Sequence, residues 1–196
     1  MPVYLGLDLA GSEKRATGFA VIFTSTLEDF GIVRSNEEIF SIIDLWRPDI
    51  VAIDSPLSYS ELPYRECDLK LKLLGANPLP LNLPGMKMLI DRAIKLKNEM
   101  EKRGIEVIET FPHGILRVLG YEKKPKSKTK RGKLMSEILL LFGIKKGKYF
   151  SSLSTDEFDA ILCSLAAYSY GIKHYIELKG EGCSIILPRP SLIRKL

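Results

Sequence analysis

The sequence predicts an α/β fold in which a mixed sheet, an antiparallel meander followed by parallel strands, is flanked by helices. Two stretches carry this prediction, Val3 to Asp8 (VYLGLD) and Asp49 to Asp54 (DIVAID). Both are apolar without hydrophobic/polar alternation, which is typical of strands covered on both faces. A helical pattern lies between them, and a helix between two buried strands predicts a right-handed crossover that makes those strands parallel.

Local patterns predict the other elements of the first third of the chain. Thr17 to Phe23 and Glu28 to Arg34 are predicted strands, which complete an antiparallel meander with the first strand. Asn36 is expected to cap a helix whose isoleucines recur at helical spacing, and Arg47-Pro48 is expected to end it.

Residues 55–84 interrupt this regular pattern. They contain five of the eleven prolines and one short predicted helix, at about 63–74. A connection of this length is typical of a lid or binding loop, so we expect an inserted proline-rich lid at about 55–84. An amphipathic helix from Lys87 to Arg103 is predicted next, with Gly104 as its C-cap.

The second half of the chain adds a strand and several helices. Ile105 to Glu109 (IEVIE) is a predicted strand. The Ser154-x-x-Glu157 pattern predicts a helix start, because the serine hydroxyl and the glutamate carboxylate cap each other's backbone amides. Also predicted are a helix from Phe111-Pro112 to Leu119, an apolar helix near 134–142 and two short strands within 175–187.

Length and composition favour one globular domain. The chain has 196 residues, of which 45% are hydrophobic and 27% charged, so we expect a single domain over 1–196. No apolar run approaches the ~18 residues of a membrane-spanning helix, so no membrane partner is expected. The amino terminus shows no signal-peptide pattern. The absence of glutamine and the presence of only four asparagines indicate a thermophilic source.

The cysteines predict a reducing compartment. Cys67, Cys163 and Cys183 are odd in number, lie far apart and form no CxxC pair. We therefore expect no disulfide framework, no disulfide-linked partner and a cytoplasmic location. The oligomeric state stays open.

Acidic side chains supply the candidate chemistry. Asp8, Asp54 and Glu109 each end a predicted strand, and Asp156 and Asp159 lie three residues apart on the last predicted helix, so they share a face. The chemistry of open α/β sheets gathers at the carboxyl ends of the strands. We expect Asp8, Asp54, Asp156 and Asp159 to bind metal, and Asp8, Asp54, Asp159 and Glu109 to be catalytic.

Oxygen-only ligands favour the hard cations Mg²⁺ or Mn²⁺. Two such ions ~3.5–4 Å apart can stabilise the attacking and leaving oxygens of phosphodiester hydrolysis. Only two histidines are present, without ligand spacing, so a soft-metal site is not expected. Each acid also has a purely structural interpretation. Asp8 and Asp54 can cap turns, Asp156 can stabilise a helix N-terminus, and Glu109 can be a solvated strand end.

Positive charge is concentrated in one segment. The basic stretch, about 122–148, holds ten lysines or arginines and two acids, so it carries +8, while the rest of the chain carries −3. This asymmetry favours a polyanionic partner, and we expect nucleic acid, either DNA or RNA. Lys126, Lys128, Lys130 and Arg131 are the candidate phosphate contacts. The alternative is a solvated lysine-rich loop.

Several short motifs resemble a known family. The order of meander, helix, Asp-ending strand and acidic helix resembles the ribonuclease-H-like fold, and DEFDA (Asp156 to Ala160) is similar to the paired aspartates of RuvC-type Holliday-junction resolvases. Five motifs in order resemble the family catalogued as domain of unknown function 429, described as predicted nucleases: GLDLAG from Gly6 with Thr17-Gly18, IDSPLS from Ile53, RECD from Arg65, ETFP from Glu109, and DEFDA.

The resemblance implies functional residues as well as a fold. The acids of the family motifs correspond here to Asp8, Asp54, Glu109 and Asp159, with Asp156 nearby. The RECD motif falls in the inserted lid and implies that Arg65 and Asp68 contact substrate.

These observations lead to one main hypothesis and two alternatives. The first is a divalent-metal-dependent nuclease that hydrolyses phosphodiesters of nucleic acid. The second is a non-catalytic nucleic-acid-binding module of the same fold. The third is an actin-like-fold phosphotransferase, because DLAG at Asp8 followed by Thr17-Gly18 resembles the first phosphate loop of that class. IDSPLS, however, has no glycine and cannot be the second glycine-rich loop.

Overall fold

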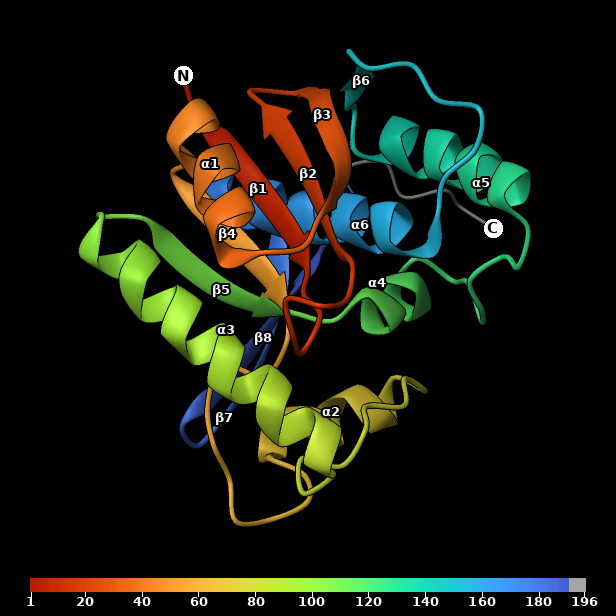
Figure 1. The fold of residues 1–196 in the computed structure, drawn as a ribbon. Coiled ribbons are helices and arrows are strands. Elements are labelled where there is room, and N and C mark those ends of the chain that lie inside the picture. The colour runs from red at the N-terminus through yellow and green to blue at the C-terminus, as the bar shows by residue number, and fades with distance from the viewer. Residues whose placement is uncertain (191–196) are drawn as a thin grey trace.

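A six-stranded sheet with the strand order β5-β4-β1-β2-β3-β6 organises the molecule. The computed structural model describes residues 1–190 (Figure 1). The meander β1-β2-β3 is antiparallel, while β4 pairs parallel with β1 and β5 pairs parallel with β4. The predicted fold class is therefore confirmed. The strands of this sheet are β1 (Val3–Asp8), β2 (Thr17–Phe23), β3 (Thr26–Val33), β4 (Ile50–Asp54), β5 (Glu106–Thr110) and β6 (Lys145–Lys146).

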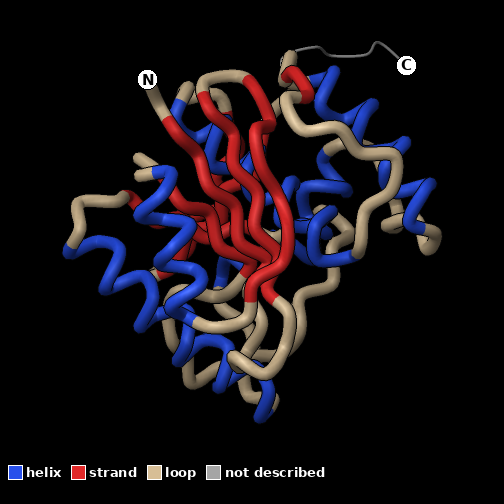
Figure 2. Tube along the Cα trace, turned by 45° about the horizontal axis from the view of Figure 1, so that its top comes forward, coloured by secondary structure: helices blue, strands red, loops and turns tan. Residues whose placement is uncertain are grey.

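Helices cover both faces of the sheet. Figure 1 shows α1 and α3 on one side and α6 on the other, and Figure 2 shows the twisted sheet between them. A separate hairpin, β7 (Tyr175–Gly180) with β8 (Cys183–Pro188), packs against α6, α2 and β5. The helices are α1 (Asn36–Trp46), α2 (Glu66–Leu73), α3 (Pro84–Lys102), α4 (Pro112–Val118), α5 (Lys128–Leu141) and α6 (Thr155–Gly171).

The alternation of side chains along β1 divides the core into two halves. Leu5 and Leu7 pack with Ile39 and Ile43 of α1 on one face. Tyr4 points to the other face, where α6 lies. Since side chains alternate with a period of two along a strand, Gly6 and Asp8 also belong to the α6 face.

Two glycines let α6 approach the sheet closely. A Cβ on Gly6 would lie 2.1 Å from the backbone nitrogen of Ser164, and one on Gly18 would lie 2.1 Å from the backbone oxygen of Asp156. Only glycine therefore fits at these points without moving the helix. This close contact brings the acidic first turns of α6 to the end of β1.

The starts of α1 and α5 differ from the sequence prediction, and α3 begins at Pro84 instead of Lys87. The cap of α1 is Ser35 and not Asn36, because Ser35 Oγ accepts from the Glu38 amide in a capping box. The Asn36 side chain instead accepts from Arg92. Helix α5 begins at Lys128, because Ser127 Oγ accepts from the Lys130 amide and caps it. Part of the expected lysine-rich loop is therefore helical.

The structure also corrects the expectation about cysteines. Cys67 on α2 and Cys183 on β8 form a disulfide across 116 residues of sequence. No spacing pattern in the sequence predicts a disulfide of this span, because only the folded chain brings the two segments together. The bridge ties the inserted segment to the β7–β8 hairpin. Cys163 is free and buried in α6.

No helix within residues 1–190 is long and apolar enough to cross a membrane. The expected domain extends to residue 196, and positions 191–196 lie outside the described residues.

Replacing Gly6 by Ala should destabilise the protein by about 1–3 kcal/mol, because the new methyl group collides with backbone that cannot move alone. Gly85→Ala is the matched control: no atom lies within 4 Å of its Cβ position, and it lies in α3. It should be neutral or stabilise by up to about 1 kcal/mol. Chemical denaturation measures both. Equal stability of Gly6→Ala and the parent protein would refute the close-contact argument.

Candidate active site

Asp8 and Asp54 end two neighbouring parallel strands. Leu7 pairs with Ile53 in the register of β1 and β4, so the two aspartates that follow lie at the same edge of the sheet. Neighbouring strands are ~5 Å apart. Side chains alternate between the two faces of a sheet along each strand, so Asp8 and Asp54 lie on the same face as Gly6 and Ala52, two positions earlier. This is the face that α6 covers.

Helix α6 supplies the other two acids of this edge. Its start is set by the predicted capping box, in which Ser154 and Glu157 exchange hydrogen bonds of 2.7 and 3.1 Å. Asp156 lies in the first turn, and Asp159 lies one turn further and is 8% exposed. Cys163 follows Asp159 by four residues, and its thiol is buried within reach of the charges of Asp54, Asp8 and Asp159.

The pKa values show that three of these carboxyl groups interact. Burial raises the pKa of Asp8 to about 8, and the charges of Asp159 and Asp156 contribute to the rise. Burial also raises the pKa of Asp54, with Asp8 and Asp159 as the next causes. The pKa of Asp159 is raised chiefly by burial. We call Asp8, Asp54 and Asp159 the carboxylate cluster, with Asp156 at its margin.

A lysine that the sequence analysis did not single out contacts this cluster. The ammonium of Lys124 forms an ion pair with Asp159 Oδ2. Its charge lowers the pKa of Asp159, and it also lowers the pKa of Asp8 and of Asp54, against the larger effect of burial. Lys124 therefore provides positive charge to all three members of the carboxylate cluster.

The donor set of the carboxylate cluster fits a hard divalent cation. It consists of oxygen ligands alone, which suit Mg²⁺ and Mn²⁺. Burial and the charges of neighbouring acids raise the pKa values of Asp8 and Asp54, and the charge of a divalent cation would oppose both effects. Within residues 1–190, however, no three His, Cys, Asp or Glu side chains are already arranged to hold a metal ion. Positive charge is supplied to these acids by the ammonium of Lys124, which pairs with Asp159.

Glu109 lies outside the carboxylate cluster. It pairs with Ile53 and not with Asp54, so alternation along β5 turns it to the opposite face of the sheet. Arg65 donates to both of its carboxylate oxygens, at 2.9 and 2.5 Å, and the Leu57 amide donates to Oε2 at 2.8 Å. Burial raises the pKa of Glu109, and Arg65 opposes this effect. The charge of Glu109 nevertheless raises the pKa of Asp54, and both residues line one cavity, so the catalytic assignment of Glu109 stays a prediction.

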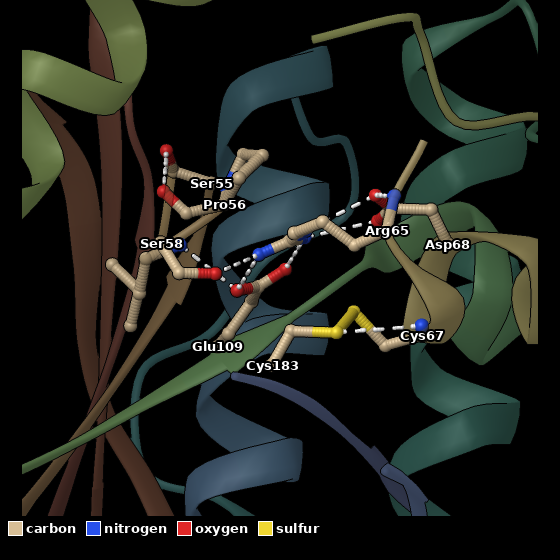
Figure 3. Close-up of polar contacts among 9 residues, drawn as sticks. Ser55, Pro56, Ser58, Arg65, Cys67, Asp68, Glu109 and Cys183 are labelled. Atoms are coloured by element: carbon tan, nitrogen blue, oxygen red, sulfur yellow. Dashed lines mark hydrogen bonds and ion pairs between the residues drawn. A yellow bond between two sulfur atoms is a disulfide. The ribbon is translucent and has the colours of Figure 1, made fainter. Parts of the chain in front are cut away.

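The burial and pairing of Arg65 and Asp68 do not fit their expected substrate-binding role. Arg65 is 5% exposed and Asp68 3%, and they form a bidentate ion pair at the start of α2. Figure 3 shows the Arg65 guanidinium between Asp68 and Glu109, beside the Cys67–Cys183 disulfide. Ser58 accepts a further hydrogen bond from Arg65. This network anchors the inserted segment to β5 and leaves no free guanidinium donor pointing to solvent.

The basic stretch divides into exposed and buried members. Lys126, Lys128 and Lys130 are exposed, and the latter two lie in the first turn of α5, whose positive dipole end adds to their charge. Arg131 is 6% exposed and donates to the backbone oxygens of Leu153, Pro125 and Lys126 at 2.7–3.0 Å. Arg131 therefore holds the loop before α5 in place, and its expected phosphate contact is withdrawn.

Cavities reach the acids from two sides. One of about 650 Å³ is lined by Asp8, Asp156 and Arg15 together with apolar residues of the insertion and α3. Another of about 250 Å³ is lined by Asp54 and Asp159 with Lys124 and His113. Small ligands and solvent can thus approach the carboxylate cluster on both sides.

The raised pKa of Asp8 predicts how stability depends on pH in metal-free buffer. In the unfolded chain Asp titrates near ~3.9, whereas in the fold Asp8 titrates at about 8. Between these values the folded state binds more protons, so its stability falls as the pH rises through this window. Asp8→Asn removes this contribution.

Thermal unfolding with EDTA at pH 5 and pH 8.5 measures the effect. The gain in Tm of Asp8→Asn over the parent should be larger at pH 8.5, by at least the ~2–4 °C that 1 kcal/mol produces in a chain of this size. Parallel pH profiles of variant and parent would contradict the assigned pKa shift.

Comparisons with known proteins agree with the observed fold. The fold is similar to that of T. thermophilus RuvC in complex with Holliday junction substrate, with a TM-score of 0.52 and 13% sequence identity over 88% of this chain and 96% of that one. At this identity the likeness concerns the fold, which is ribonuclease-H-like. No curated protein matches the sequence.

A family described as protein of unknown function (DUF429) matches residues 6–175, in agreement with the motif order seen in the sequence. Since this match covers most of the chain, the protein belongs to the DUF429 family.

Proposed function

We propose that this protein is a divalent-metal-dependent nuclease that hydrolyses phosphodiester bonds of nucleic acid. The observation that carries the proposal is the carboxylate cluster at the carboxyl edge of a ribonuclease-H-like sheet, in which the charge of Asp159 raises the pKa of Asp8, and the charges of Asp8 and Asp159 raise the pKa of Asp54. Carboxylates at such an edge are the ligands that Mg²⁺ and Mn²⁺ prefer.

Each member of the site has a specific role in this proposal. Asp8, Asp54 and Asp159 would hold Mg²⁺ or Mn²⁺, and the bound ion would supply a nucleophilic water and charge stabilisation for phosphodiester hydrolysis. Asp156, which lines the 650 Å³ cavity together with Asp8, adds negative charge beside Asp8. Cys163 stays a neutral thiol, because burial and the three acids raise its pKa well above its usual range.

Nucleic acid is the proposed substrate for two reasons. The neighbouring RuvC structure contains a Holliday junction substrate, which is DNA. In addition, exposed lysines gather at the N-terminus of α5, and Lys124, at the carboxylate cluster, belongs to the same basic stretch. A phosphate backbone that follows these lysines would lead toward the acids.

A non-catalytic nucleic-acid-binding module is the second candidate. It is favoured by Lys124, which already gives the carboxylate cluster a counter-charge, and by the absence of a prearranged three-ligand set within residues 1–190. Under this alternative the acids would serve structure alone, and the basic surface would still bind nucleic acid.

A hydrolysis assay separates the two candidates. Purified protein should cleave DNA or RNA with Mg²⁺ or Mn²⁺ and lose activity with EDTA. Asp8→Asn and Asp54→Asn should each reduce cleavage at least about a hundredfold, because each removes a charged ligand of the ion, while nucleic-acid binding is kept. Asp44→Asn, a distant exposed carboxylate paired with Arg103, is the matched control and should stay active. Intact substrate with every divalent cation tested, despite binding, would favour the second candidate.

The proposed phosphate contacts have their own test. Replacing Lys126, Lys128 and Lys130 by Ala should flatten the log–log salt dependence of nucleic-acid affinity by about 2–3 units, since each neutralised phosphate contributes about 0.7–0.9. Arg131 is excluded from this variant because it is buried and would destabilise the fold.

A second triple-alanine variant, at Lys95, Lys102 and Lys179, removes the same charge from exposed positions elsewhere and serves as the control. It should lower affinity only slightly and keep the slope. If both triple variants shift the slope equally, only net charge matters, and α5 is not the interface.

A further inference from the structure

Lys124 occupies an unusual position for a lysine of a basic stretch. Its ammonium is not fully solvated: it pairs with Asp159, and its side chain is 28% exposed. It also lines the 250 Å³ cavity together with Asp54 and Asp159. Among the charges that lower the pKa of Asp8, Asp54 and Asp159, Lys124 is the one common to all three groups.

This position places Lys124 in competition with a divalent cation. A carboxylate oxygen that accepts from an ammonium is engaged, and two cations confined to one small cluster repel each other strongly, because the Coulomb energy grows as the local dielectric constant falls. A cation bound by Asp159 would therefore require the Lys124 ammonium to leave. The absence of a ready three-ligand set within residues 1–190 agrees with this competition.

The surroundings of Lys124 suggest what removes it. The residue lies in the connection between α4 and α5, where the neighbouring Lys123 and Lys126 are exposed. A lysine stem is long and flexible, so its ammonium can exchange one oxygen anion for another without moving the backbone. A phosphate group held by the adjacent lysines would offer such an anion at short range.

We propose that Lys124 is an internal counterion that closes the carboxylate cluster to a divalent cation until a phosphate backbone draws its ammonium away. The inference rests on the proposed function, because it takes nucleic acid as the source of the phosphate. It makes metal binding and nucleic-acid binding mutually dependent: each should strengthen the other by the same factor. The free protein would then hold metal weakly and become loaded at its substrate.

The first test measures metal binding without nucleic acid. Mn²⁺ is titrated calorimetrically at pH 8.5 into the parent protein, Lys124→Met and Lys126→Met. Methionine keeps the apolar stem and removes the charge. Lys124→Met should bind Mn²⁺ about tenfold or more tightly than the parent, a change of ~1.4 kcal/mol. Lys126→Met, which removes an exposed charge from the same segment, should differ less than about twofold, because exposed charges are screened. Equal or weaker Mn²⁺ binding by Lys124→Met would overturn the proposal.

The second test measures the coupling and does not depend on the stability of one variant. Mn²⁺ affinity is determined with and without a phosphorothioate oligonucleotide, whose own Mn²⁺ binding is measured separately and subtracted. The oligonucleotide should tighten Mn²⁺ binding by the parent, and Lys124→Met and Lys124→Gln should lose that gain. An affinity of the parent that the oligonucleotide does not change would also overturn the proposal.

Failure of the proposed function would give a different result. In that case the parent protein would not cleave nucleic acid with any divalent cation tested, whether or not it binds it. Failure of this inference alone would leave binding and cleavage intact, with the same Mn²⁺ affinity in the parent protein and in Lys124→Met.

Discussion

The close contact of α6 with the centre of the sheet is the constraint on which the site depends. Gly6 and Gly18 have no side chain, and the backbone of α6 occupies the space that a Cβ would need. The helix therefore lies near enough to β1 and β4 for Asp159 to meet Asp8 and Asp54. A larger residue at Gly6 would push away α6, which carries Asp159 of the carboxylate cluster.

This contact brings negative charges close together, and the positive charge nearby compensates them only in part. Three acids are brought together in a largely buried site, where burial raises their pKa values and the charges of neighbouring acids add to the rise. A nearby cation stabilises the ionised form of these acids. Lys124 supplies one charge from within the chain, and the proposed divalent ion would supply two. Competition between these cations links the chemistry of the site to the basic stretch beside it.

The charges on the other side of β5 have a different function. Arg65, Asp68 and Glu109 are buried, paired and hydrogen-bonded to one another, so they hold the inserted segment in place. Removing one partner of such a network leaves an uncompensated buried charge, which is costly. Together with the Cys67–Cys183 bridge, the network fastens α2 to β5 and β8. Strand β5 pairs with β4, which ends in Asp54. Residues of a family motif, such as Arg65 and Asp68 of RECD, can therefore have a structural role.

Local sequence patterns predicted strands β1 to β5 and singled out Asp8, Asp54 and Asp159 as candidate site residues, but they did not predict the two-residue strand β6. Apolar runs that end in Asp predicted β1 and β4, and the capping box at Ser154 predicted the helix that carries Asp159. The tertiary structure was needed to place Glu109, Arg131 and Lys124, to show that Arg65 and Asp68 are buried and paired, and to reveal the Cys67–Cys183 disulfide. In-register pairing decides which face Glu109 points to, and long-range contacts decide that Arg131 is buried while Lys124 reaches the acids. Such contacts join segments far apart in the chain, and no local spacing encodes them.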